Sequence, residues 1–343
     1  MKKHTNLSNT VLLIAMISLP AMSFAANGDD IDKKKNLSKS YTVTASDKLE
    51  IDNSFGNVVI NTWEKNEIKV DVEIGVKAST EEKAQDMMNE IEVKDYQSGH
   101  SISWKTDIGD INDNHHGKRN KNNDENDRKF YIDYTIHMPA GNPLQIENSF
   151  GKITVPDFKG QVNLTSKFGG LTTGKLADVD EIDVEFGSAE LGSIHNGEVT
   201  FKFNSKSTID NVSGSVKVKS EFSGDVQFGV DNNIQELSVS ESYSTIRMTV
   251  TKSLSAKFDI HTSFGNFKNV TDINISEEKE DDDNGPKFDR DYSGQSGDGK
   301  AKIKIKSSFG KVRISDSGEK PGTSKNDSDD EDEKSNKVKS KSI

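Results

Sequence analysis

A short phrase of polar and apolar residues recurs along this chain and organises its hydrophobic pattern. It is Asn-Ser-Phe-Gly at 53–56 and 148–151, and Ser-Lys-Phe-Gly at 166–169. Apolar residues lie six and four positions before the aromatic residue, and others lie three and often five positions after it. A phrase repeated this often is an architectural unit of the fold.

We call the aromatic residue of each repeat its anchor. From residue 150 to residue 264, successive anchors are 17–21 residues apart. The predicted structural positions are the anchors and the glycines that follow many of them: Phe55, Gly56, Phe150, Gly151, Phe168, Gly169, Phe186, Gly187, Phe203, Phe222, Tyr243, Phe264, Gly265, Phe309 and Gly310. In the looser repeat at 203, Asn204 replaces the glycine, which predicts a local bulge.

The spacing of apolar residues predicts a strand, a corner and a second strand in each repeat. Side chains alternate along a strand, so positions −6, −4 and the anchor are expected to share one buried face. The next apolar residue, three positions later, has the opposite parity, which requires a bend or bulge. Glycine after the anchor permits such a bend, because it tolerates positive φ. A small polar residue at position −2 is expected to stack on its equivalents.

These features predict an all-β fold, specifically a β-solenoid resembling a parallel β-helix, with coils of about 18–21 residues. A propeller blade needs about 40 residues, so the repeat is too short for one. The stacked anchors are expected to form an aromatic ladder inside the coils. An antiparallel β-sandwich of many hairpins is the alternative.

Residues 57–143 interrupt the repeats. Alternating apolar residues predict strands at 68–76, around 102–104 and at 130–138. Between them, Ser79 and Glu82 resemble a capping box, so one short helix is expected, with Ser79 as its N-cap.

The ends of the chain differ in composition from the repeats. A basic start, an apolar run and small residues before position 26 predict a signal peptide at 1–25. Polar residues predict a flexible leader at 26–40 and a disordered charged tail at 316–343. The repeat domain is expected to span 41–315, with an acidic insertion at 276–299.

Charge and composition exclude several classes of function. The net charge of −12 argues against nucleic-acid binding, which needs a basic surface. The chain has no cysteine, so disulfides do not contribute to its stability. No later run is long and apolar enough to cross a membrane as a helix.

The sequence resembles the putative-adhesin family of bacterial β-strand-repeat envelope proteins, a domain of unknown function. The resemblance rests on the phrases at 53–58 and 148–153, on Thr62-Trp63 and on Met138-Pro139. It covers about residues 41–315 and implies a solenoid-like fold and export. It implies no catalytic residues.

Candidate chemistry is sparse. Asp178, Asp180, Glu181, Asp183 and Glu185 form an acidic cluster that alternation along a strand predicts to be a solvated face. His115 and His116 lie among aspartates in a polar loop, but adjacent histidines seldom bind one metal ion. The acidic runs lack the spaced ligands of a calcium-binding loop, so no metal, cofactor or catalytic residue is expected.

The sequence therefore predicts a non-enzymatic binding or scaffolding protein of the bacterial envelope, exported to the periplasm or cell surface. The expected partner is an envelope protein or a polysaccharide. The alternatives are a carbohydrate-active β-helix enzyme and an envelope-stress sensor that binds cationic peptides.

Overall fold

The computed structural model describes residues 30–109, 129–278 and 288–317. Within these ranges the chain forms 22 strands and one helix, which confirms the all-β class. The predicted signal peptide, most of the polar loop, the acidic run of the insertion and the charged tail lie outside the described residues. No helix in the described part is long and apolar enough to span a membrane.

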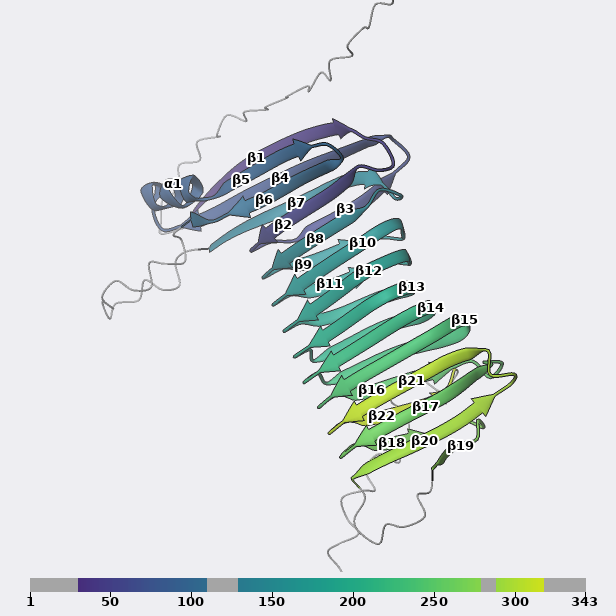
Figure 1. Ribbon diagram of the computed structural model, residues 1–343. Coiled ribbons are helices and arrows are strands. Elements are labelled where there is room, and N and C mark those ends of the chain that lie inside the picture. Colours follow the sequence, from purple (N-terminus) through teal and green to yellow (C-terminus); the bar gives the residue numbers. More distant parts are fainter. Residues whose placement is uncertain (1–29, 110–128, 279–287, 318–343) are drawn as a thin grey trace, which may run out of the picture.

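The central repeats stack into a column whose strands lie side by side (Figure 1). Strands one repeat apart pair in parallel: Leu164 pairs with Ile146 on one side and with Ile182 on the other. Equivalent residues therefore stack on one another from repeat to repeat. The column contains β8 (Leu144–Ser149), β9 (Lys152–Val155), β10 (Phe158–Lys167), β11 (Gly170–Thr173), β12 (Leu176–Glu185), β13 (Ser188–Lys202), β14 (Lys206–Glu221), β15 (Asp225–Ser242) and β16 (Thr245–Val250).

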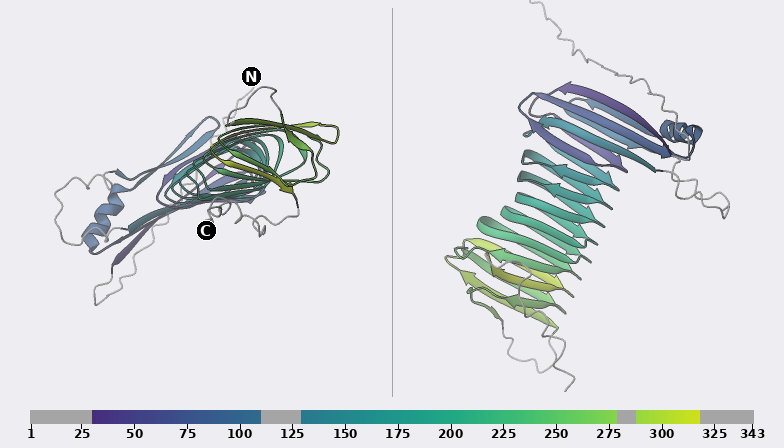
Figure 2. Two further views of the ribbon diagram at one scale, coloured as in Figure 1. Left: turned by 90° about the horizontal axis from the view of Figure 1, so that it is seen from below. Right: turned by 180° about the vertical axis from the view of Figure 1, so that it is seen from behind.

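The core is a single cluster of aliphatic side chains that runs the length of the column. The apolar positions six and four before each anchor, and those after the corner, point into it; Val162, Leu164 and Leu171 are 0–1% exposed. Seen along the column, the strands of successive repeats form two facing layers (left view of Figure 2). The buried side chains lie between these layers.

The N-terminal end of the column is covered by the excursion between the first two repeats. Strands β2 (Lys48–Ser54) and β3 (Val58–Trp63) form the first coil. Beyond it lie β4 (Glu67–Ala78), β5 (Glu92–Ser98), β6 (Ser101–Asp107) and β7 (Lys129–Pro139), joined largely by antiparallel pairing. The three strands predicted here are confirmed.

Two predictions for this end were wrong. Residues 31–40 are not a flexible leader but belong to strand β1 (Ile31–Thr42), which pairs with β4 over its whole length. The long edge of β4 offers backbone partners that a polar sequence does not reveal. Helix α1 (Glu81–Glu90) is capped by Thr80 instead of Ser79: the Thr80 hydroxyl accepts a hydrogen bond from the Lys83 amide.

The C-terminal repeats do not stack in chain order. The unit formed by β21 (Ala301–Ser308) and β22 (Lys311–Asp316) lies between two earlier repeats, although it comes last in the sequence. β21 pairs in parallel with β15 on one side and with β17 (Ala256–Ser263) on the other. β22 likewise lies between β16 and β18 (Asn266–Asn269). The order of the repeats in the sequence is therefore not their order in the stack.

The repeat at 264 therefore ends the parallel stack. Strand β20 (Asp289–Ser296) covers it by antiparallel pairing with β17, and β19 (Ile275–Glu277) pairs with β20. Antiparallel strands thus terminate the column at both ends. They cover the outer edges of β17, β7 and β6, which would otherwise be open to pairing with other chains.

The glycines after the anchors are required for close approach between repeats. A Cβ atom on Gly169 would lie closer than 3.0 Å to the carbonyl oxygen of Gly151, and one on Gly187 would meet Gly169 in the same way. None of these glycines adopts a positive φ; the anchors do. The predicted reason for glycine, its tolerance of positive φ, was therefore wrong. Glycine is needed here because a side chain would clash with the backbone of the neighbouring repeat.

We expect Gly169→Ala to destabilise the protein by about 2–3 kcal/mol, because the added methyl forces neighbouring backbones apart. The adjacent Gly170→Ala is a matched control, since its Cβ would meet only ordinary contacts at 3.7 Å or more. Thermal unfolding of both variants checks this. Equal midpoints for the two variants would contradict the close-approach role.

Candidate functional site

The anchors occupy the corner of each repeat and adopt a backbone conformation that is unusual for aromatic residues. All nine have φ between 49° and 62°, in the left-handed region. For a bulky residue this conformation costs about 1–2 kcal/mol. It also sets the direction of the side chain, because the left-handed residue changes the parity of the strand at the corner.

This parity change places the anchors outside. The residue at position −2 faces the core, and so does the residue three positions after the anchor. The anchor ring lies on the opposite side of the backbone and points to solvent. Phe150, Phe168, Tyr243 and Phe309 are each 50% exposed. The prediction that the anchors fill the core was wrong, and spacing alone did not reveal it because the change in parity occurs at the anchor itself.

The anchor rings stack on one another along the outer edge of the column. Neighbouring anchors lie 4.7–5.4 Å apart between ring centroids, with interplanar angles of 2–11°. The order of the rings follows space and not sequence: Phe309 lies between Tyr243 and Phe264. We call this stack the aromatic ladder.

Two further aromatic residues extend the ladder beyond the anchors. Phe130 tilts against Phe55 at one end, at 51°, and Phe288 stacks on Phe264 at the other. Phe130 lies in β7, and Phe288 directly precedes β20. The faces of the rings are therefore occupied by neighbouring rings, and the ring edges face solvent.

Small polar residues at position −2 line the inside of the same corner, as predicted. Asn53 donates from Nδ2 to Asn148 Oδ1 over 3.0 Å, and both residues are 0–1% exposed. Ser166, Ser220, Thr262 and Ser307 occupy the equivalent position in other repeats and are also buried. The corner thus has apolar rings outside and hydrogen-bonding groups inside.

The middle repeats replace the glycine with side chains that accept hydrogen bonds from backbone amides of the preceding repeat. Asn204 Oδ1 accepts from the Gly187 amide, and Ser223 Oγ accepts from the Asn204 amide. Ser244 Oγ accepts from the Ser223 amide in turn. Strand pairing places one extra residue after the anchors at 203 and 222, which makes room for these side chains.

Glu241 is a buried acid that the sequence pattern did not single out. It lies at position −2 of the Tyr243 repeat and is 3% exposed. Its carboxylate accepts from the Ser307 hydroxyl and the Ser244 amide. Burial raises the pKa of the Glu241 carboxyl, and these hydrogen bonds partly oppose that change. A charged residue at a position that holds small polar residues in most repeats, and apolar Val184 and Phe201 in two others, was the available signal.

The acidic cluster at 178–185 has a cationic partner on the next repeat. Lys202 Nζ lies 3.3 Å from Asp183 and 2.9 Å from Glu185. Burial raises the pKa of the Asp183 carboxyl, whereas Lys202 opposes that change. Register between repeats brings Lys202 beside the cluster, a neighbour that the order of residues in the sequence does not reveal.

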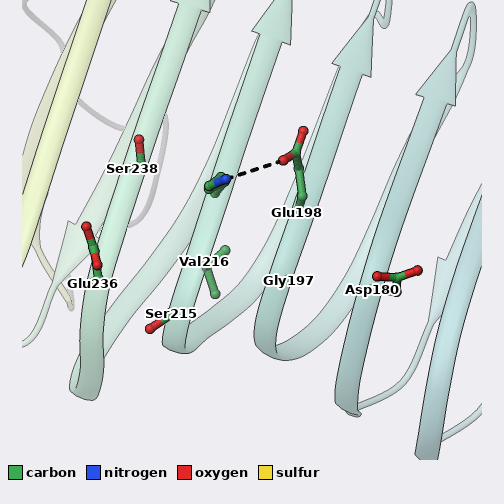
Figure 3. A pocket seen from close by; sticks show the side chains of 8 residues that line it. Asp180, Gly197, Glu198, Ser215, Val216, Glu236 and Ser238 are labelled. Carbon is green, nitrogen blue, oxygen red and sulfur yellow. Dashed lines mark ion pairs between the residues drawn. The ribbon is translucent and has the colours of Figure 1, made fainter.

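A shallow hollow of about 360 Å³ lies on the same outer face, over β12 to β15 (Figure 3). Asp180, Glu198 and Glu236 surround it together with Ser238 and Lys217, which lies 4.0 Å from Glu198. The hollow is open to solvent, and its side chains come from four successive repeats. It offers charged and hydroxyl groups without an enclosed apolar pocket.

Among the residues that the structure describes, no group of three or more histidine, aspartate, glutamate or cysteine side chains is placed to hold a metal ion. The candidate pair His115 and His116 lies outside the described residues. The hollow and the aromatic ladder are two features of the described residues that could contact another molecule.

Comparison with known proteins finds only distant similarities. No protein-family model matches the chain, and no curated protein matches it in sequence. A structure from Clostridium sporogenes named a "putative cell adhesion protein" is 16% identical, with coverage of 83% of this chain and 100% of that chain and a TM-score of 0.23. A "putative adhesin" from Bacteroides fragilis is 12% identical, covers 82% and 97%, and has a TM-score of 0.34.

A "putative lipid binding protein" from Parabacteroides distasonis is 10% identical, with coverage of 81% and 96% and a TM-score of 0.29. Membership of the family that the sequence resembles stays a prediction. The function is inferred below from the residues of this chain.

The outward position of the anchors changes the effect expected for truncating one. Phe168→Ala is expected to cost about 1–3 kcal/mol, because it removes two stacking contacts but leaves only a small cavity. Phe168→Gly removes the same contacts and also relieves the left-handed strain, so it is expected to be about 1 kcal/mol more stable than Phe168→Ala. Chemical denaturation measures both. A loss of 4–5 kcal/mol for alanine would indicate a buried ring instead.

The raised pKa of Glu241 predicts a specific pH dependence. The folded protein holds a proton on this carboxyl more readily than the unfolded chain, whose ordinary value is 4.5. Raising the pH above about 4.5 and through the raised pKa therefore destabilises the folded state. Relative to Glu241→Gln, the parent should lose unfolding free energy across this range. The exposed control Glu190→Gln should follow the parent, and a constant gap between parent and Glu241→Gln would contradict the assignment.

Proposed function

We propose that this chain is a non-enzymatic binding protein, a β-solenoid whose contact edge is the aromatic ladder. The observation that carries this proposal is the exposure of eight of the nine anchor rings, each in a left-handed backbone conformation that is unfavourable for an aromatic residue. The ninth, Phe55, is half-buried beneath Phe130. Stacking contributes about 0.5–1.5 kcal/mol for each ring pair, which is close to the cost of one left-handed aromatic residue. Stability alone therefore gives little reason to place an aromatic residue at every corner.

An exposed, continuous apolar line supports contact with another molecule. The ladder is narrow and runs along one edge of the column, so it suits an extended apolar surface more than a small ligand. Sugar rings stack on aromatic faces, and along the ladder those faces are already covered by neighbouring rings. A protein of the cell envelope with an apolar ridge or strand is the partner that this edge suits best.

An adhesin-like role at the cell surface or in the periplasm agrees with this proposal. The predicted signal peptide supports export. The net negative charge of the chain argues against binding to nucleic acid. The outer faces beside the ladder carry paired charges such as Lys202 with Glu185. Such pairs limit non-specific adhesion and leave the ladder as the apolar contact.

The contact edge can be tested with anchor substitutions that keep the corner conformation. Asparagine tolerates the left-handed region, so Phe186→Asn, Phe203→Asn and Phe222→Asn remove rings with little added strain. Retention on immobilised phenyl groups should fall stepwise with one, two and three substitutions. Tyr96→Asn is the control for one ring, because Tyr96 is 67% exposed away from the ladder.

Equal retention of the triple variant and the parent would overturn the ladder as the contact edge. The enzymatic alternative is tested separately on the carboxylates of the hollow. Turnover of an acidic or neutral polysaccharide that is lost on Glu198→Gln would replace binding with carbohydrate chemistry as the function.

A further inference from the structure

The inserted unit β21–β22 has an outer surface unlike that of any other described repeat. Its outward positions before the anchor are Lys302, Lys304 and Lys306, and those after the anchor are Lys311 and Arg313. Only Ser308, beside the anchor, is uncharged among these outward strand positions. We call these five cations the cationic belt, because they continue across the corner at Phe309 from one face to the other.

The lysines of the belt are not neutralised by neighbouring strands. Within the part of the chain that the structure describes, Lys302, Lys304, Lys306 and Lys311 make no ion pair. Elsewhere on the column, lysines such as Lys202 and Lys219 pair with a carboxylate on an adjacent repeat. The belt is therefore a local reversal of charge on a chain whose net charge is −12.

The neighbouring repeats place mainly hydroxyl groups beside the lysines of the belt. Strand register puts Lys304 beside Ser238 and Lys306 beside Ser240. Glu236 and Asp259 are in register with Lys302 and Lys304, but these lysines form no ion pair among the described residues. On the other face, Arg313 lies between Lys268 and Arg247, which pairs with Asp225.

A purely structural reason for the belt is weak. Lysine on a strand often blocks edge-to-edge pairing, but β21 and β22 are paired on both sides and have no free edge. Alternating lysines along a central strand also repel one another across about 6.6–6.8 Å. An external anion bound along the strand would offset this repulsion.

We propose that the cationic belt binds an anionic polysaccharide, independently of the aromatic ladder. Its cations lie on both faces of the column, with Lys302 seven residues before the corner. A flat membrane surface resting on the corner cannot reach Lys302, because about 20 Å of strand separates it from the edge. A flexible anionic chain can follow the belt around the corner, and serine hydroxyls beside the lysines can hydrogen-bond its sugar oxygens.

The test uses polygalacturonate oligomers as the carboxylate-bearing probe and neutral dextran of similar size as the control. Calorimetric titration of the chain from residue 26 onward should show binding to polygalacturonate and none to dextran. Because the contacts are ionic, the affinity should fall steeply between about 50 and 200 mM salt, the range over which binding to polyanions weakens. Absence of binding to polygalacturonate would overturn the proposal.

Two sets of variants separate the belt from net charge. Lys302→Gln, Lys304→Gln and Lys306→Gln together should lower the affinity at least about tenfold at 50 mM salt. Lys152→Gln, Lys159→Gln and Lys175→Gln change net charge equally at exposed sites outside the belt, and should leave most of the affinity. Equal losses in the two sets would contradict a specific site.

A second background controls for competition by the acidic run at 329–333. Titrations are repeated on the same chain from residue 26 onward with Asp329→Asn, Asp330→Asn, Glu331→Gln, Asp332→Asn and Glu333→Gln. Absence of binding in both backgrounds would overturn the proposal, since competition from the tail is then removed. Phosphatidylglycerol vesicles provide the last comparison: tighter belt-dependent binding to vesicles than to polygalacturonate would identify a membrane as the partner instead.

Discussion

The change in side-chain parity at each corner is the constraint on which the rest of this structure depends. A strand that simply continued would turn its apolar residues to solvent after the anchor. The left-handed anchor prevents this, and it does so nine times along the described column. Its consequences are linked: the ring turns outward, the residue after it turns inward, and the two backbones approach so closely there that glycine is required at most corners.

Stacking in register converts this local constraint into long rows of like residues. Rings stack on rings outside the corner, and small polar groups stack inside it. Where glycine is absent, the side chains of Asn204, Ser223 and Ser244 each accept a hydrogen bond from a backbone amide of the preceding repeat. Glu241 ends this row at the inserted repeat, where its carboxylate meets Ser307.

Much of the fold followed from the sequence because apolar spacing reports burial directly. The all-β class, the strand pattern and the inward aliphatic positions such as Leu164 were predictable in this way. The direction of the anchors was not, because spacing does not distinguish a corner residue that points inward from one that points outward. Strand β1 was missed because its partner edge, not its own hydrophobicity, holds it.

The order of the repeats and the candidate binding surfaces also needed the structure. Nothing in the sequence of 301–316 indicates that this unit lies between earlier repeats. Its insertion places the five cations of the belt between the strands of two earlier repeats. Lys202 beside Asp183 depends in the same way on register between repeats. The sequence could predict the candidate rows, but only stacking determines which residues are neighbours.

The most direct test of the corner geometry uses the absence of cysteine from the chain. Phe186→Cys places a single thiol at an anchor, and Ile182→Cys places one at the buried position −4 of the same repeat. The labelling rate of each native protein with a charged, water-soluble thiol reagent is compared with that of its unfolded chain. The outward anchor predicts fast labelling at 186 and strong protection at 182, and equal protection at both positions would contradict it.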